Sequence, residues 1–128
     1  MTVFVDLSAD TDALMRTTVT TRSDGERLIV ALAGDLDCAN AGTVETQVAA
    51  VLRVRSPRHV VIDLTAVEFC DAAGVRMLLA LHHAAVAAGA TYLLYRPRAH
   101  VGWLLETLDA GHLVRNAADG DDPAPGGG

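Results

Sequence analysis

Aspartate side chains occur where an α/β fold would place chemistry. Asp35 and Asp37 follow one predicted strand, Asp63 lies in another, and Asp71 precedes a predicted helix. Sites in α/β sheets form at the carboxyl ends of strands, and carboxylate oxygens are ligands that Mg²⁺ accepts. The four carboxylates therefore raise the hypothesis of a magnesium-dependent phosphoryl-transfer site.

Other features of the sequence argue against that hypothesis. An Asp-x-Asp pair after a strand resembles the start of a haloacid-dehalogenase-type phosphatase, and an acidic cluster at strand ends resembles a response-regulator receiver. Both families also use a lysine, and the phosphatase needs a longer chain. Every one of the ten basic residues here is arginine. We therefore expect no enzyme, no metal and no cofactor, with phosphoryl transfer or a receiver-like domain as the less favoured alternative.

The cysteines and histidines show no spacing typical of a metal site. Cys38 and Cys70 are too few for a structural zinc site and fit no disulfide framework, so both are expected to be small buried residues. No His-x-x-x-His pair is present, and the histidines are expected on the surface or satisfied in the core. They are His59, His82, His83, His100 and His112.

The stretch from Asp63 to Val75 leads from a predicted central strand through a short loop into a helix. Asp71 lies where an N-cap carboxylate accepts backbone N–H groups, and the positive end of the helix dipole favours negative charge nearby. Taken alone, these residues fit a capped helix without any further role.

Runs of apolar and β-branched residues predict the strands that position this loop. Residues 14–21 and 27–33 flank an Asp-Gly turn and predict a hairpin. The continuous apolar run over 59–64 is typical of a strand buried on both faces. A further strand is expected over 90–95, and Leu113 and Val114 predict one last short element.

Apolar residues at helical spacing predict three helices. The first follows Asn40, which is expected to cap it, and ends before Pro57. The second is expected over 73–88, and the third begins after Pro97 and ends at Gly111. The expected core stripe of the second helix is Val75, Leu78, Leu79, His82 and Val86, bordered by Met77 and Leu81. The stripe of the third is Val101, Leu104, Leu105 and Leu108.

The element order β-β-α-β-α-β-α predicts the α/β class, with a small mixed sheet, parallel crossovers and helices packed against it. Residues 14–115 are expected to form this single domain. Residues 1–13 are expected to be a flexible acidic segment, and 116–128 a disordered acidic tail rich in Gly and Pro.

The charge distribution bears on location and partners. The net charge of −6 lies entirely in the two end segments, and residues 14–115 carry ten acidic residues and ten arginines. A balanced domain lacks the basic excess typical of nucleic-acid binding. Every apolar run is too short to span a bilayer, and no secretory signal is visible. We therefore expect a cytoplasmic protein without a nucleic-acid or direct membrane partner.

Two motifs together resemble the STAS domain of bacterial anti-sigma-factor antagonists. Gly34-Asp35-Leu36-Asp37 is similar to the family's Gly-acidic-apolar-Asp turn into the first helix, and Phe-Cys-Asp-Ala-Ala-Gly-Val over 69–75 is similar to its apolar-apolar-Asp-Ser-Ser/Ala-Gly-Leu signature. The resemblance extends over residues 14–114. It implies a signalling protein that binds an anti-sigma factor of the serine-kinase type and so influences sigma-factor-dependent transcription.

One departure from the family pattern concerns regulation. The partner kinase of the family phosphorylates the serine after the aspartate, but Ala72 stands there and Ala73 offers no hydroxyl either. The resemblance implies a state equivalent to the permanently unphosphorylated protein. The partner-binding residues that it implies are Asp37, Asn40, Asp71, Ala72, Ala73, Gly74 and Arg76.

The sequence also fits two other interpretations of the surface. The chain also fits a STAS-like, non-catalytic subunit of a larger signalling or lipid-transport complex, with the same loop and helix in permanent contact. Trp103 lies about 200° around the third helix from Val101 and is expected to face away from the core. An exposed tryptophan suggests a second interface, through self-association or a larger complex, and the alternative is an indole half-covered by a neighbouring loop.

Overall fold

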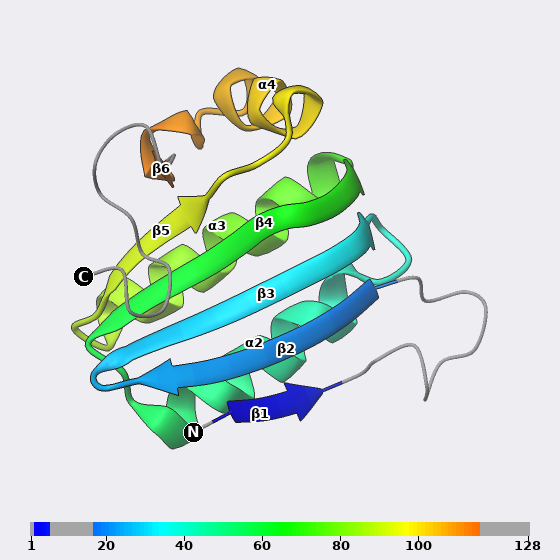
Figure 1. The fold of residues 1–128 in the computed structure, drawn as a ribbon. Helices are drawn as coiled ribbons and strands as arrows, with labels where there is room; N and C mark the ends of the chain where they lie inside the picture. Colours follow the sequence, from blue (N-terminus) through cyan, green and yellow to red (C-terminus); the bar gives the residue numbers. More distant parts are fainter. Residues whose placement is uncertain (1, 6–16, 116–128) are drawn as a thin grey trace.

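The computed structural model describes residues 2–5 and 17–115, and these residues form one mixed sheet with helices against it (Figure 1). The elements in chain order are β1 (Thr2–Val5), β2 (Thr17–Asp24), β3 (Arg27–Leu36), α2 (Ala41–Arg55), β4 (His59–Cys70), α3 (Ala72–Ala87), β5 (Thr91–Tyr95), α4 (Ala99–Thr107), the 3₁₀ helix η2 (Gly111–Leu113) and β6 (Val114–Arg115). The predicted α/β class is confirmed.

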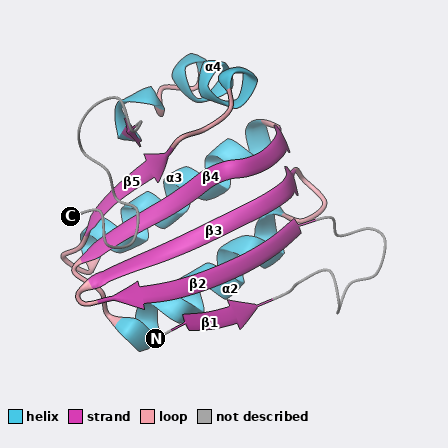
Figure 2. Ribbon diagram, viewed as in Figure 1, coloured by secondary structure: helices cyan, strands magenta, loops and turns pink. Residues whose placement is uncertain are grey.

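The six described strands lie side by side in chain order. β1, β2 and β3 pair antiparallel, and β3 to β6 pair in parallel. Each parallel connection passes through a helix, as a crossover between parallel strands requires. Gly25, with φ +65°, forms the tight turn of the β2–β3 hairpin. Figure 2 shows α2 and α3 together behind one face of the sheet.

The core lies between this face and the helices. Its largest fully buried side chains include Leu32, Ile62, Leu64, Leu78, Leu81 and Leu94. A second, smaller cluster of Ile29, Val61 and Tyr95 lies apart from this main core. Because Ile62 belongs to the main cluster and its neighbour Val61 to the other, β4 is buried on both faces, as the apolar run predicted.

β4 is longer than expected, because residues 65–70 belong to the strand and not to a loop. The core-facing residues of β4 are Val60, Ile62, Leu64, Val67 and Cys70. Their spacing is two residues up to Leu64 and three beyond it. A strand is predicted from apolar residues at every second position. The prediction therefore stops at Leu64, where the spacing of the core-facing residues changes from two to three.

The change of spacing comes from two irregularities in the pairing of β3 with β4. The flanking pairs are Ala31–Asp63 and Ala33–Ala66 for the first, and Gly34–Val67 and Asp35–Phe69 for the second. Each time β4 contains one extra residue, which is the definition of a β-bulge. Gly34 has φ +94°, a backbone conformation that favours glycine.

The expected core stripes of the helices are partly wrong. In α3 the buried residues are Gly74, Val75, Met77, Leu78, Leu81 and Ala85. Val86 is 54% exposed and His82 only partly covered, because α3 packs against both the sheet and α2 and so buries a differently oriented face. In α4 only Val101 and Leu105 are buried, and Leu108 lies after the helix has ended.

The N-terminal segment differs from the expectation of a flexible 1–13. Thr2–Val5 form β1, which pairs with β2 from Thr2–Arg22 to Val5–Val19. The four residues are good strand formers, and β2 offers them an otherwise unpaired edge. Residues 6–13 and the tail 116–128 lie outside the described residues. Within the described part of the chain, no helix has the length and apolarity needed to cross a membrane.

Candidate functional site

Asp71 links the two loops at the carboxyl ends of β3 and β4. Its Oδ1 accepts the Gly74 backbone N–H at 3.0 Å, as the predicted N-cap of α3, and its Oδ2 accepts the Cys38 backbone N–H at 3.2 Å. The Asp71 backbone N–H donates to the Leu36 carbonyl at 3.0 Å. One aspartate therefore holds the start of α3 against the β3–α2 loop.

The β3–α2 loop is ordered by Asp37. Its Oδ1 accepts the Ala39 N–H at 3.0 Å, and its carbonyl accepts the Ala41 N–H at 2.8 Å. The Asp37 N–H donates to Asn40 Oδ1 at 3.0 Å. Asp37 is only partly exposed, and Cys38 and Ala39 are on the surface. Cys38 was expected to be buried, but the tight loop turns it outward.

Asn40 is the N-cap residue of α2, as expected, and its carbonyl accepts the Val44 N–H at 3.0 Å. Its side chain makes no capping bond to α2 and is only 1% exposed. Its Nδ2 instead donates to Thr17 Oγ1 and to the Asp35 carbonyl, both at 2.8 Å, and Thr17 Oγ1 also donates to that carbonyl. The side chain of Asn40 therefore anchors the β3–α2 loop to β2 and β3 through hydrogen bonds. Because it is buried, this side chain is not available to a partner.

Ala72, Ala73 and Arg76 lie on the accessible side of the first turns of α3, with Arg76 exposed and the alanines partly so. Gly74 is buried. A Cβ at Gly74 would lie 2.7 Å from the Leu36 carbonyl oxygen and 2.8 Å from Cys70 Sγ. Gly74 therefore permits close approach of α3 to the strands, and it supports the surface without forming part of it.

The four aspartates do not form one cluster. Asp63 lies at the first bulge of β4, opposite Ala31, and its Oδ1 accepts both the N–H and the hydroxyl of Thr65 at 2.9 and 2.6 Å. It is separated from Asp71 because β4 continues for seven residues beyond it. In the residues that the structure describes, no group of three or more His, Cys, Asp or Glu side chains could hold a metal ion.

Sequence reasoning missed Phe69, which lies two residues before Asp71 and whose side chain is 49% exposed. The three-residue spacing of the apolar residues Val67 and Cys70 could have indicated its exposure, because this spacing places two consecutive residues outside the core. Cys70 itself is buried. Burial, and secondarily the negative charge of Asp71, raise the pKa of the Cys70 thiol to about 11, so the thiol is neutral at physiological pH.

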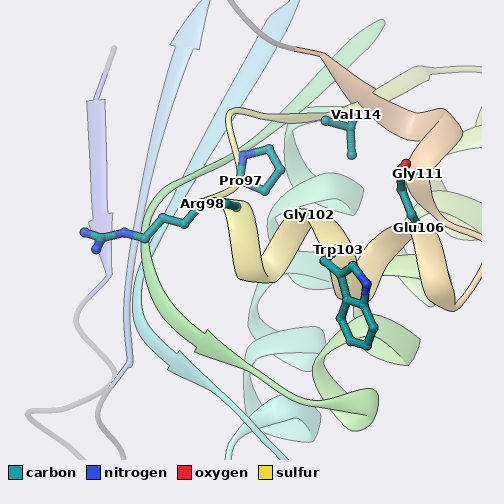
Figure 3. Close-up of a pocket in the computed structure, with 8 residues that line it drawn as sticks. Pro97, Arg98, Gly102, Trp103, Glu106, Gly111 and Val114 are labelled. Carbon is teal, nitrogen blue, oxygen red and sulfur yellow. The ribbon is translucent and has the colours of Figure 1, made fainter.

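Trp103 faces away from the core, as its helical position predicted, and is 68% exposed. It borders an open hollow of about 530 Å³ between α4 and β6. Figure 3 shows the indole projecting from α4 while Arg98 extends away from it. The first turn of α4 is tied to the bulges of β4, because His100 Nε2 lies 2.6 Å from the Glu68 carbonyl and Arg98 Nε donates to the Thr65 carbonyl at 3.3 Å.

Comparison with known proteins agrees with this architecture. The anti-sigma factor antagonist SpoIIAA of Bacillus, in its unphosphorylated form, is similar with a TM-score of 0.68 and 14% identity, over 77% of this chain and 86% of that one. An anti-sigma factor antagonist from Mycobacterium paratuberculosis gives a TM-score of 0.61 and 25% identity, over 77% and 84%.

A longer protein shares the fold as one part of its chain. The murine anion transporter Slc26a9 gives a TM-score of 0.57 and 22% identity, over 71% of this chain and 14% of that one. No curated protein matches the sequence. Residues 17–118 match the STAS domain, and this match extends over most of the chain. The protein therefore belongs to the STAS domain family.

Proposed function

We propose that the protein is an anti-sigma-factor antagonist that acts in the cytoplasm by binding, without catalysis. It binds a serine-kinase-type anti-sigma factor and thereby influences sigma-factor-dependent transcription. The observation that carries the proposal is the bridge from Asp71 to Gly74 and Cys38, which presents Ala72 on a fixed surface. Membership of the STAS family and the likeness to two antagonists support it.

The proposed contact surface combines the β3–α2 loop with the first turns of α3. Asp37, Asp71, Ala72, Ala73 and Arg76 form it. Asn40 and Gly74 hold it from below, because both are buried. Since the aspartates are already engaged by backbone N–H groups, the surface is ordered before binding, which lowers the entropic cost of association.

Ala72 gives this surface a fixed state. A methyl group accepts no phosphate, so the switch that adds charge at this position in the resembled family does not operate here. Thr65 is the nearest hydroxyl in β4, but its Oγ1 is bonded to Asp63 at 2.6 Å. The protein then binds its partner whenever both are present, and the amount of complex depends on the concentrations of the two proteins.

A phosphorylation assay distinguishes this fixed state from a mechanism in which the partner kinase switches the protein off. The wild-type protein incubated with ATP and a purified serine-kinase-type anti-sigma factor of the host keeps its mass. Ala72→Ser restores a hydroxyl at the same place and gains one phosphate. A phosphate on the wild-type protein, mapped for example to Thr65, would contradict the fixed state.

Calorimetric titration with the same anti-sigma factors tests the surface. Ala72→Glu adds an uncompensated charge to the contact, which costs about 3 kcal/mol or more, a hundredfold or greater loss of affinity. Ala84→Glu places the same charge on an exposed position of α3 outside the site and leaves affinity unchanged. Equal binding by both variants, with native circular dichroism, would place the interface elsewhere.

A second candidate is a non-catalytic subunit of a larger signalling or transport complex. The exposure of Trp103 favours it, because an exposed indole on α4 offers a surface outside the proposed contact residues. Size-exclusion chromatography with light scattering, with and without the anti-sigma factor, distinguishes the two. A binary complex supports the antagonist, and self-association that Trp103→Ala abolishes supports the subunit.

A further inference from the structure

Phe69 is exposed because of the second bulge in β4. Val67 and Cys70 both enter the main core, so Glu68 and Phe69 lie consecutively on the outside, where an unbroken strand would have turned one of them inward. The bulge is visible in the pairing, which steps from Gly34–Val67 to Asp35–Phe69. A bulge bends the strand and reorients side chains, and such bulges are frequent beside functional sites.

The backbone on both sides of Phe69 is fixed. On one side the Glu68 carbonyl lies 2.6 Å from His100 Nε2 of α4. On the other, the Asp71 N–H donates to the Leu36 carbonyl at 3.0 Å, and Cys70 is buried against the position of Gly74. A large apolar side chain on an immobilised backbone loses little entropy on binding, which is the property of an interface anchor.

Phe69 is continuous with the surface that holds Ala72. It lies three residues before Ala72, where β4 leads directly into α3 (Figure 1). Carboxylates surround it in sequence and pairing, with Glu68 before it, Asp71 after it and Asp35 opposite on β3. Arg76 is the one exposed base in the first turns of α3. His100 and Arg98 of α4 lie against the carbonyls of Glu68 and Thr65, so the carboxylates lie toward β3 and α3 and two basic side chains lie toward α4.

We propose that Phe69 is the apolar anchor of the partner surface, with its ring inserted into an apolar pocket rimmed by basic residues on the anti-sigma factor. This inference rests on the proposed function. The apolar pocket matches the half-exposed ring, and the basic rim matches the carboxylates at Asp35, Glu68 and Asp71. Attraction between opposite charges accelerates association and depends on salt, whereas burial of the ring slows dissociation.

The test uses the full-length protein and the purified anti-sigma factor that wild type binds. Phe69→Ala is expected to weaken binding about tenfold to a hundredfold, mainly through faster dissociation. Phe69→Leu retains most of the affinity. Val86→Ala removes a similarly exposed apolar side chain from the far end of α3 and stays within about twofold of wild type. Raising salt slows association of wild type and of Phe69→Leu alike.

Circular dichroism and thermal melting of each variant show whether it is folded. If Phe69→Ala is unfolded, a photo-crosslinking phenylalanine analogue at position 69 replaces it, and a crosslink to the anti-sigma factor is expected. Wild-type affinity in folded Phe69→Ala, together with loss in Ala72→Glu, would overturn the anchor and leave the proposed function standing. Failure of the wild-type protein to bind any anti-sigma factor of the host overturns both.

Discussion

Gly74→Ala tests whether the start of α3 is rigidly docked on the strands. The added Cβ would lie 2.7 Å from the Leu36 carbonyl oxygen and 2.8 Å from Cys70 Sγ. The carbonyl is backbone and cannot turn aside, so α3 must shift. Forcing a methyl group into a packed site costs about 1–3 kcal/mol, while alanine gains at most about 1 kcal/mol over glycine in helix propensity.

Both contacts are shorter than 3.0 Å and one is with backbone, so the cost lies at the upper end of this range, about 2–3 kcal/mol, and the net loss in the free energy of unfolding is about 1–2 kcal/mol. For a domain of this size each kcal/mol lowers the melting temperature by roughly 4–8 °C, so a decrease of about 5–15 °C is expected. The shift of α3 also lengthens the bond between the Gly74 N–H and Asp71 Oδ1, now 3.0 Å. Binding of the anti-sigma factor should weaken with stability.

Gly42→Ala is the matched control, because Gly42 lies in the first turn of α2 with nothing within 4 Å of its added Cβ. The same substitution there stabilises by about 0.5–1 kcal/mol, since it removes the backbone freedom of glycine from the unfolded chain. The two variants should shift the melting temperature, followed by circular dichroism, in opposite directions. A Gly74→Ala protein as stable as wild type would refute the close docking of α3.

Two further predictions concern pH and fluorescence. Burial, then the charges of His83 and His112, lower the pKa of His82 below 6.5, so the folded protein binds fewer protons than the unfolded one. The stability from His82 is present above pH 6.5 and is lost as pH falls below it. The melting temperature should therefore decrease less between pH 7 and pH 5 in His82→Leu than in wild type, and equal decreases would contradict this. Trp103 should emit near the red limit and be quenched by iodide in dilute protein, since it is 68% exposed. A blue emission that resists iodide would show that the indole is covered.

The end segments carry the net charge of the chain, and one of them also contains a strand. The net charge of −6 lies outside residues 14–115, where ten acidic residues balance ten arginines. Removing the end segments therefore changes the net charge without changing the proposed surface. Removing residues 1–13 also deletes β1, whose pairing covers the outer edge of β2. A lower melting temperature after that truncation reports the lost strand.

Local features of the sequence determined much of the fold. The order of strands and helices, the N-cap at Asp71 and the outward position of Trp103 all follow from periodicity and short-range bonding. An N-cap depends on residues three positions apart, and the face of a helix repeats every 3.6 residues. Such patterns lie within a single helix or strand, so they can be recognised without knowledge of the tertiary structure. The motif around Asp71 also indicated the STAS family, which the comparison confirms.

Tertiary structure decided the features that depend on pairing between distant segments. The two bulges lie in the pairing of β4 with β3, and the second of them places Phe69 outside the core. Asn40 is buried because Thr17 and Asp35 meet it from other strands. A buried side-chain amide needs hydrogen-bond partners, and the residues next to it in the sequence do not indicate which residues of neighbouring strands supply them. Asp71 shows both contributions, because the sequence predicts its bond to Gly74, whereas only the packed fold brings Cys38 to its second oxygen.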